Sequence, residues 1–166
     1  MKPIQKITIR SPRLSDTDSI LKLMNSLVEE KAMLGMQKKL TRREAIKWLE
    51  ERIENKERLS LFLIADKEIV GSVRISKGKD GVGTVGISVE KEFRGIGLGT
   101  KLLEKAMNDG AKKFKLRIIT LEVLKINKIA IRLYKKLGFE KIGTLKKGAK
   151  YYDRYEDSII MAKYLK

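Results

Sequence analysis

The chain has 166 residues, of which 42% are apolar. This length fits one domain, and this composition supports a buried core. The longest apolar runs, at 61–65 and 158–162, are far shorter than the ~18 residues of a membrane span, and residues 1–10 lack the apolar centre of a secretory signal. We therefore expect a single domain over residues 1–166, in a soluble protein of the cytoplasm.

The formal net charge is +17, because 38 Lys and Arg stand against 21 Asp and Glu. A surplus of this sign attracts anions, so a nucleic acid, an acidic protein surface and a polyphosphate cofactor are all compatible partners. The abundance of Lys and Glu is also typical of hyperthermophile surfaces. The charge alone does not decide between these explanations.

The sequence contains neither cysteine nor histidine. This excludes disulfides, thiol nucleophiles and a Ser-His-Asp triad, and we expect no metal site. Any proton transfer must then depend on Glu, Asp, Lys, Tyr or water.

The hydrophobic pattern predicts helices and strands in one α+β (α/β mixed) domain, with a mixed, mostly antiparallel sheet of about seven strands flanked by four helices. The predicted elements, in chain order, are a strand at 6–12, a helix from Ser15 or Asp16 to Gly35, a helix beginning after Thr41, two strands within 60–76, a strand at 82–90, a helix at 98–110, a strand at 114–124, a helix from 128 to Gly138 and strands at 139–145 and 155–165.

Local signals set several of these ends. Thr41 and Glu44 form the sequence pattern of a capping box. Gly35 and Gly110 are expected to end their helices. The inner stripe of the second helix is predicted to comprise Ala45, Trp48, Leu49, Arg52 and Ile53.

A glycine-rich turn precedes the third helix. Residues 92–106 read EFRGIGLGTKLLEKA, with Gly95, Gly97 and Gly99 at alternate positions after Arg94. The first turn of a helix has free N–H groups and a partial positive charge, and glycines let a phosphate approach them. The spacing fits neither a Walker A loop nor a dinucleotide-binding fingerprint. A turn without a ligand is the simpler alternative.

Two segments resemble the GNAT superfamily of N-acetyltransferases. R-G-I-G-L-G resembles its R/Q-x-x-G-x-G/A signature, and residues 119–143 resemble its L-E-V-x-x-x-N-x-x-A-I-x-L-Y-x-x-x-G-F block. The resemblance covers roughly residues 60–165 and implies the GNAT fold and acetyl-CoA (coenzyme A) as cofactor. It implies that backbone amides hold the pyrophosphate and that a strand end lies against the pantetheine arm and polarises the thioester carbonyl. The implied cofactor-binding residues are Ile87, Ser88, Val89, Arg94, Gly95, Ile96, Gly97, Leu98, Gly99, Thr100, Asn127 and Tyr134.

The resemblance also assigns the chemistry. It implies that Tyr134 donates a proton to the departing thiolate and that Glu122 is the general base for the amine. The alternatives are a tyrosine in the core and a pocket-rim glutamate paired with a lysine. Asn127 matches an asparagine that contacts pantetheine in the family, and it is equally suited to cap the following helix.

The acceptor is predicted from the tail KKGAKYYDRYEDSIIMAKYL, which resembles the ending of ribosomal-protein alanine N-acetyltransferases and of relatives that acetylate free amino acids. The resemblance implies direct attack by a primary amine, foremost the α-amine of a peptide or protein, with a free amino acid or other small amine as the alternative. Tyr151, Tyr152 and Asp153 then lie near the acceptor mouth, unless they form an ordinary hairpin. A basic nucleic-acid or ribosome-binding module and an inactive acyl-CoA sensor are rival classes, and a monomer and a homodimer both fit the sequence.

Overall fold

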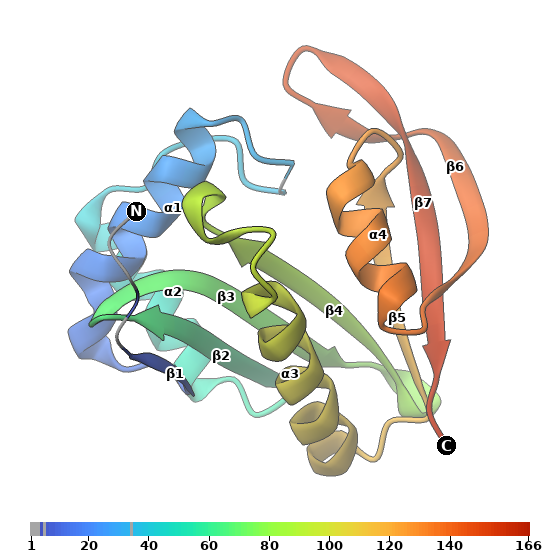
Figure 1. Ribbon diagram of the computed structural model, residues 1–166, viewed down its shortest axis with the longest axis horizontal. Helices are drawn as coiled ribbons and strands as arrows, with labels where there is room; N and C mark the ends of the chain where they lie inside the picture. Colours follow the sequence, from blue (N-terminus) through green and yellow to red (C-terminus); the bar gives the residue numbers. More distant parts are fainter. Residues whose placement is uncertain (1–3, 5, 34) are drawn as a thin grey trace.

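A seven-stranded sheet with helices on both faces makes up the computed structural model, which describes residues 4, 6–33 and 35–166 (Figure 1). The elements are β1 (Ile7–Arg10), α1 (Thr17–Glu29), α2 (Arg42–Glu54), β2 (Arg58–Ala65), β3 (Glu68–Lys77), β4 (Val82–Val89), α3 (Leu98–Phe114), β5 (Ile118–Leu124), α4 (Lys128–Lys136), β6 (Glu140–Tyr151) and β7 (Arg154–Tyr164).

The strand order is β1-β2-β3-β4-β5-β7-β6. Every neighbouring pair is antiparallel except β4 and β5, which are parallel. This arrangement confirms the predicted fold class and the predicted order of elements. It also places the strand before the glycine-rich turn beside the strand that carries Glu122.

Two hydrophobic clusters cover the two faces of the sheet. One cluster joins α3 and α4 to alternate residues of β2–β5 and β7, and the other joins α1 and α2 to the opposite side of β2 and β3. The first cluster contains the buried stripe of α3, namely Leu98, Leu102, Leu103, Ala106 and Met107. Among the described residues, no helix combines the length and the apolar character that crossing a bilayer requires.

The parallel pair in the middle of the sheet is short. β4 and β5 pair only at Val82–Ile118, Gly83–Ile119 and Thr84–Thr120. Beyond these positions β4 continues to pair with β3 as far as Val89, and β5 continues to pair with β7 as far as Leu124. The two halves of the sheet therefore separate, as the space between β4 and α4 in Figure 1 illustrates.

Two predicted helix ends are wrong. The third helix continues past Gly110 to Phe114, so the strand expected from 114 begins at Ile118. Gly110 is buried within the helix, where an added Cβ would lie 3.0 Å from Ile75, so the glycine serves close contact with β3. The left-handed residue that ends the helix is Lys115.

The first helix ends at Glu29, well before Gly35. Lys31 takes the left-handed conformation that glycine usually provides, and the amide of Ala32 donates to the carbonyl of Leu27, as in a Schellman motif. A lysine in this position gives no signal in the sequence, which explains the error.

The Thr41–Glu44 capping box is confirmed, since the Thr41 hydroxyl accepts from the Glu44 amide and the Glu44 carboxylate accepts from the Thr41 amide. In the inner stripe of α2, Ala45 and Leu49 are buried as predicted. The prediction that Ile53 is an inner residue is wrong, because almost half of its surface is exposed.

Asp16 lies at the start of α1, but its side chain does not cap the helix. Its carboxylate accepts two hydrogen bonds from the Arg10 guanidinium and one from the Arg13 amide. Burial raises the pKa of the Asp16 carboxyl, but these bonds outweigh burial and hold the pKa below its ordinary value. The pair attaches the start of α1 to the end of β1.

Candidate active site

The separation of β4 from β5 opens a cleft of about 1530 Å³. Its walls come from the α1–α2 segment, α2, β3, β4, the glycine-rich turn, β5, α4 and the β6–β7 hairpin. Of the predicted site residues, those that line it are Ile87, Ser88, Val89, Arg94, Gly95, Gly97, Gly99, Thr100, Glu122, Asn127 and Tyr134. Leu98 is instead buried in the core, and the Ile96 side chain is exposed.

The glycine-rich turn presents bare backbone to the cleft. Gly95 and Gly97 have φ angles of 78° and 85°, a region that L side chains rarely adopt. A Cβ at either position would have no atom within 4 Å, so the space before them is open. Gly97 is the N-cap of α3 and offers no side chain to its amides.

The turn therefore suits a diphosphate. The amides of Leu98, Gly99 and Thr100 have no carbonyl one turn earlier in the helix, and they point out of the N-terminus of a 17-residue helix. Within the described residues, the amides of 95–97 also make no hydrogen bond. A Cβ at Gly95 or Gly97 would intrude on the space where an anion meets these amides.

Gly99 differs from its two neighbours because it is helical. An added Cβ there would lie 3.6 Å from Val89 and 3.8 Å from Leu133. The first turn of α3 thus fits between the end of β4 and α4, and the small residue keeps those three elements close together.

Arg94 is held by the protein itself. Its Nε donates to the Val89 carbonyl at 2.8 Å, and its guanidinium pairs with the Glu30 carboxylate at the end of α1. The arginine therefore links the glycine-rich turn to β4 and α1, and its charge lies at the wall of the cleft.

The free edge of β4 faces the cleft. The amide of Glu90 donates to the Val70 carbonyl, so hydrogen bonding alternates along β3 and β4 and uses the even-numbered residues of β4. The backbone groups of Ile87 and Val89 therefore point toward β5, into the cleft, whereas those of Ser88 are bound to β3. Since the Val89 carbonyl is bound to Arg94, the groups left at this edge are the Ile87 amide and carbonyl and the Val89 amide.

Glu122 and Tyr134 reach the cleft from opposite faces of the sheet. Leu121 and Val123 of β5 belong to the cluster beneath α3 and α4, so Glu122, which alternates with them, points to the other face. Glu122 is exposed and makes no ion pair within the described residues, contrary to the lysine-paired alternative. Tyr134 lies on α4, on the first face.

Burial controls the state of the Tyr134 phenol. The side chain is 6% exposed and makes an edge contact with Phe139, at 5.7 Å between ring centroids. Burial raises the pKa of Tyr134 to about 12. A phenol with this pKa keeps its proton at neutral pH, so the proton is available for donation.

Asn127 is the N-cap of α4. Its Oδ1 accepts from the Ala130 amide at 3.1 Å, as the capping alternative expected. The rest of the side-chain amide lies at the cleft wall. Capping therefore leaves its NH₂ group available as a donor to a ligand.

A bridge, which we define as Gln37, Tyr151 and Tyr152, connects the two sides of the cleft. Gln37 donates to the Lys150 carbonyl and accepts from the Tyr152 amide, at 2.9 and 2.8 Å. The Tyr151 and Tyr152 hydroxyls donate to the carbonyls of Lys31 and Val28. The two tyrosines lie at the tip of the β6–β7 hairpin, where Tyr151 pairs with Arg154, as the hairpin alternative expected, and their hydroxyls also join this tip to α1 and the residues after it. Gln37 was not predicted, because nothing local marks a glutamine whose partners lie more than 110 residues away.

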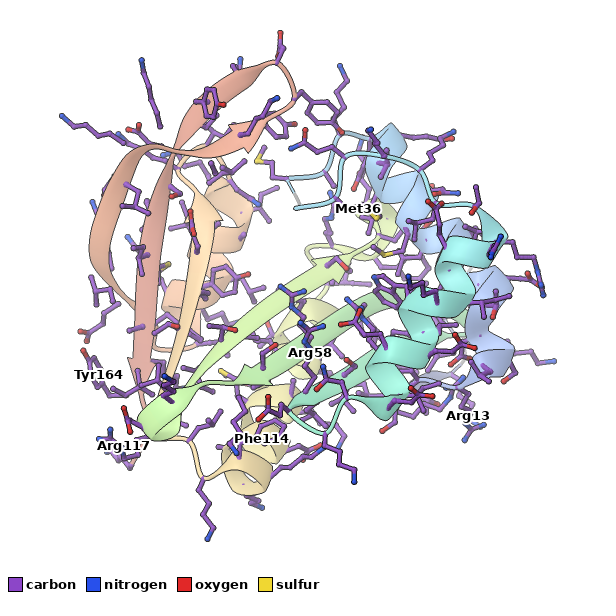
Figure 2. The ribbon with its side chains drawn as sticks, turned by 180° about the vertical axis from the view of Figure 1, so that it is seen from behind. Arg13, Met36, Arg58, Phe114, Arg117 and Tyr164 are labelled. Atoms are coloured by element: carbon purple, nitrogen blue, oxygen red, sulfur yellow. The ribbon has the colours of Figure 1, made fainter. Side chains whose placement is uncertain are left out.

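The side of the cleft next to α1 and α2 has further residues that sequence reasoning placed only in a core stripe or nowhere. Met36 is seen on the α1–α2 segment in Figure 2 and lines the cleft with Trp48, Arg52 and Arg74. Trp48 and Arg52 were expected as inner residues of α2, without a functional role. Arg74 follows from the alternation of β3 only after the sheet order is known.

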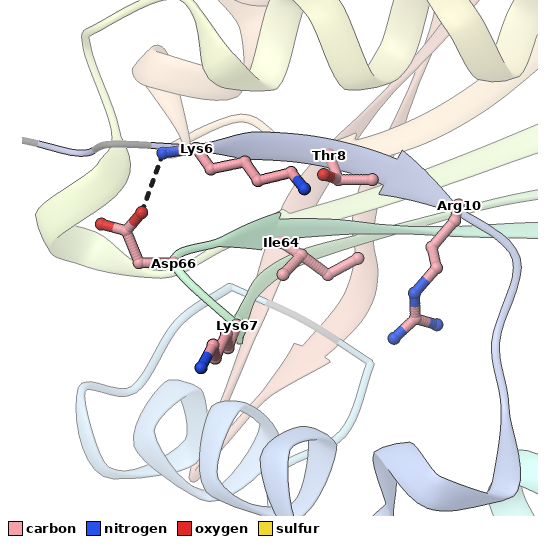
Figure 3. Close-up of a pocket in the computed structure, with 6 residues that line it drawn as sticks. All are labelled: Lys6, Thr8, Arg10, Ile64, Asp66 and Lys67. Carbon is pink, nitrogen blue, oxygen red and sulfur yellow. Dashed lines mark hydrogen bonds between the residues drawn. The ribbon is translucent and has the colours of Figure 1, made fainter.

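A second, smaller hollow lies at the β1 edge of the sheet (Figure 3). It is lined by Lys6, Thr8, Arg10, Ile64, Asp66 and Lys67. The Lys6 amide donates to Asp66 at 2.8 Å, which joins β1 to the β2–β3 turn. None of the predicted site residues lines this hollow.

Comparison with known proteins agrees with this geometry. Residues 22–139 match the acetyltransferase (GNAT) family. The chain is 30% identical to an N-alpha-acetyltransferase of Sulfurisphaera tokodaii, over 93% of this chain and 90% of that relative. A ribosomal-protein-S5-alanine acetyltransferase from Vibrio fischeri superposes with a TM-score of 0.87 at 21% identity, covering 98% of this chain and 94% of that one. A putative acetyltransferase from Salmonella typhimurium, solved with its cofactor acetyl-CoA, gives 0.83 at 20% identity, with 98% and 95% covered.

The chain therefore belongs to the GNAT acetyltransferase family. It is an N-acetyltransferase, and acetyl-CoA is the cofactor that supplies the acetyl group.

Replacing Gly97 by alanine should weaken coenzyme A binding at least tenfold in isothermal titration calorimetry. The added Cβ occupies the open space before the amides, and a φ of 85° costs an L residue about 1–2 kcal/mol. The matched control is Gly143→Ala on β6, which also adds a Cβ to open space but at ordinary φ. Equal affinities of the two variants would contradict the phosphate-binding role of the turn.

Proposed function

We propose that the acceptor is the α-amine of a peptide or protein N-terminus. The observation that carries the proposal is the bridge over the acceptor side of the cleft, where Gln37, Tyr151 and Tyr152 join the α1–α2 segment to the β6–β7 hairpin. Lys150, which Gln37 contacts, and Glu122 line the same cleft, and an extended chain end suits a cleft whose two sides are joined in this way. The name of the Sulfurisphaera tokodaii relative supports the same acceptor.

Each of the two substrates is assigned to one face of the cleft. The glycine-rich turn and Tyr134 lie on the α3–α4 face, which suits the carrier, and Glu122 lies on the α1–α2 face, which suits the amine. The slit between β4 and β5 is where the two meet. Holding both reactants at this slit supplies much of the rate acceleration through positioning.

Direct attack follows from the residues available. Acetyl-CoA supplies a thioester carbonyl and a thiolate leaving group. The chain has no cysteine or histidine that could accept the acetyl group first, so the amine nitrogen forms its bond to the carbonyl carbon as the bond to sulfur breaks. The Ile87 and Val89 amides at the β4 edge are suited to stabilise the negative charge that develops on the carbonyl oxygen.

Two proton transfers complete the reaction. Glu122 takes the proton that the amine loses, directly or through one water, and Tyr134 gives its proton to the departing sulfur. The exposed, unpaired carboxylate of Glu122 and the buried, protonated phenol of Tyr134 fit these opposite roles. Asn127 and the amides of the glycine-rich turn hold acetyl-CoA in the position that these transfers require.

The acceptor assignment is tested by measuring thiol release from acetyl-CoA with a panel of amines. We expect peptides with a free N-terminus to react at least tenfold faster, in kcat/KM, than free amino acids or polyamines. The same peptides with a blocked N-terminus and an internal lysine serve as the control and should be inert. Faster reaction of the free amino acids would replace the proposal with the small-amine alternative.

Tyr134→Phe should lower kcat by about 10²-fold and leave coenzyme A affinity nearly unchanged, because the ring contact with Phe139 is retained and only the proton donor is lost. Steady-state kinetics and calorimetry measure the two quantities. Tyr164→Phe, at an exposed position on β7, is the control and should behave as the unmodified protein does. Full turnover of Tyr134→Phe would remove the proton-donor assignment.

Glu122→Gln should move the pH profile of kcat/KM to higher pH. Without the carboxylate the amine must lose its proton to solvent before it attacks, so activity follows the titration of the amine itself. Glu104→Gln, on the exposed side of α3, is the control. An unchanged profile for Glu122→Gln would leave the general base to another group.

A further inference from the structure

A surplus of positive charge lies on the acceptor side of the cleft. Arg52 of α2 and Arg74 of β3 both line the cleft, and neither makes a hydrogen bond or ion pair with any other residue that the structure describes. Nearby Arg58, labelled over the sheet in Figure 2, is paired with Glu51. Glu51 is therefore in contact with Arg58 and acts on Arg52 only at longer range, so Arg52 and Arg74 make no direct ion pair with any described residue.

Arg52 is held in place before any ligand arrives. Its guanidinium carbon lies 3.2 Å from the centroid of the Trp48 ring, a close cation–π contact. Its Nε is fully buried and lacks a hydrogen-bond acceptor in the described part of the chain. Burial and, after it, the positive charge of Arg74 lower the pKa of Arg52 to about 10, so the two arginine charges oppose each other.

Arg74 has room to lie across the sheet. It stands opposite Gly86 on β4, and its Nε would be 3.7 Å from a Cβ at that glycine. The missing side chain at Gly86 lets the arginine extend along the face of β4 toward the slit. Arg74, Gly86 and Glu122 occupy the same level of the sheet, since Thr84 pairs with Thr120 two residues earlier.

We propose that the acceptor carries a carboxylate near its amine, and that Arg52 and Arg74 bind this carboxylate while Glu122 receives the amine. Arg52 is partly buried and its Nε lacks an acceptor within the described residues, which is costly, whereas Arg74 is exposed beside it. A carboxylate placed between the two accepts charge-assisted hydrogen bonds from both guanidinium groups. The proposal rests on the acetyltransferase assignment and on the peptide acceptor proposed above, and it names the class of peptide.

The spacing of the strands favours an acidic side chain over the α-carboxylate of a free amino acid. Arg74 and Glu122 lie on strands two positions apart, about 9.5 Å between backbones, and the separation of β4 from β5 adds to this distance. An α-carboxylate lies only two bonds from its own amine. The side chain of an aspartate or glutamate at the second or third residue of a peptide reaches farther.

The test compares three peptides that differ only at the second residue, which is glutamate, glutamine or lysine. We expect kcat/KM for the glutamate peptide to exceed that for the glutamine peptide at least tenfold, and the lysine peptide to be poorest. Arg74→Gln should reduce the glutamate-to-glutamine ratio at least fivefold, and Arg52→Gln should reduce it as well. Arg43→Gln, which removes an exposed charge from α2 outside the cleft, should keep the ratio of the unmodified protein.

Two results overturn the proposal: equal kcat/KM for the glutamate and glutamine peptides, or a preference that survives both Arg74→Gln and Arg52→Gln. If no peptide is acetylated, the peptide assignment fails separately, and the comparison moves to a free amino acid and its C-terminal amide. A preference for the free carboxylate that Arg74→Gln abolishes then upholds the arginine site, and equal rates overturn it.

Discussion

The function of this protein depends on the early separation of two parallel strands. β4 and β5 share three residue pairs and then diverge, so each strand keeps a row of backbone groups that no other strand uses. A sheet that continued to pair would bury those groups and close the passage between its faces. Because the passage stays open, Tyr134 on one face and Glu122 on the other both line the same cleft without lying side by side. In the proposed mechanism, the acid and the base are therefore kept apart until the substrates connect them.

The first turn of α3 forms one side of the passage between β4 and β5. It also connects this side to α1, α4 and the end of β4. Gly99 lets this turn approach both β4 and α4, and Arg94 ties the preceding glycines to the Val89 carbonyl and to Glu30 at the end of α1. The bridge connects the far side of the same α1–α2 region to the β6–β7 hairpin. The two sides of the cleft that the proposed function assigns to acetyl-CoA and to the acceptor therefore share one supporting element, the α1–α2 region.

The sequence predicted the features that local chemistry determines. The Thr41–Glu44 box, the alternating strands and the glycine turn each depend on residues within a few positions of one another, and each was found as expected. Helix ends were predicted poorly where Lys31 or Lys115 took a left-handed conformation in place of glycine. The opposed faces of Glu122 and Tyr134, the Gln37 bridge and the position of Arg74 depend on strand order and register. These are long-range properties that no short segment encodes.

An opening in the middle of a sheet gives the sheet four unpaired strand edges instead of two. Unpaired edges can form hydrogen bonds with strands of other chains. Here the two inner edges, of β4 and β5, face each other across the cleft. The two outer edges of the sheet, at β1 and β6, are protected from pairing by other features. β1 has only four residues, and β6 carries Lys141, Lys146, Lys147 and Lys150 together with irregular pairing near Lys147. The outer edges are therefore poor templates for pairing, and the unpaired strand backbone of the sheet is kept at the inner edges, on the cleft.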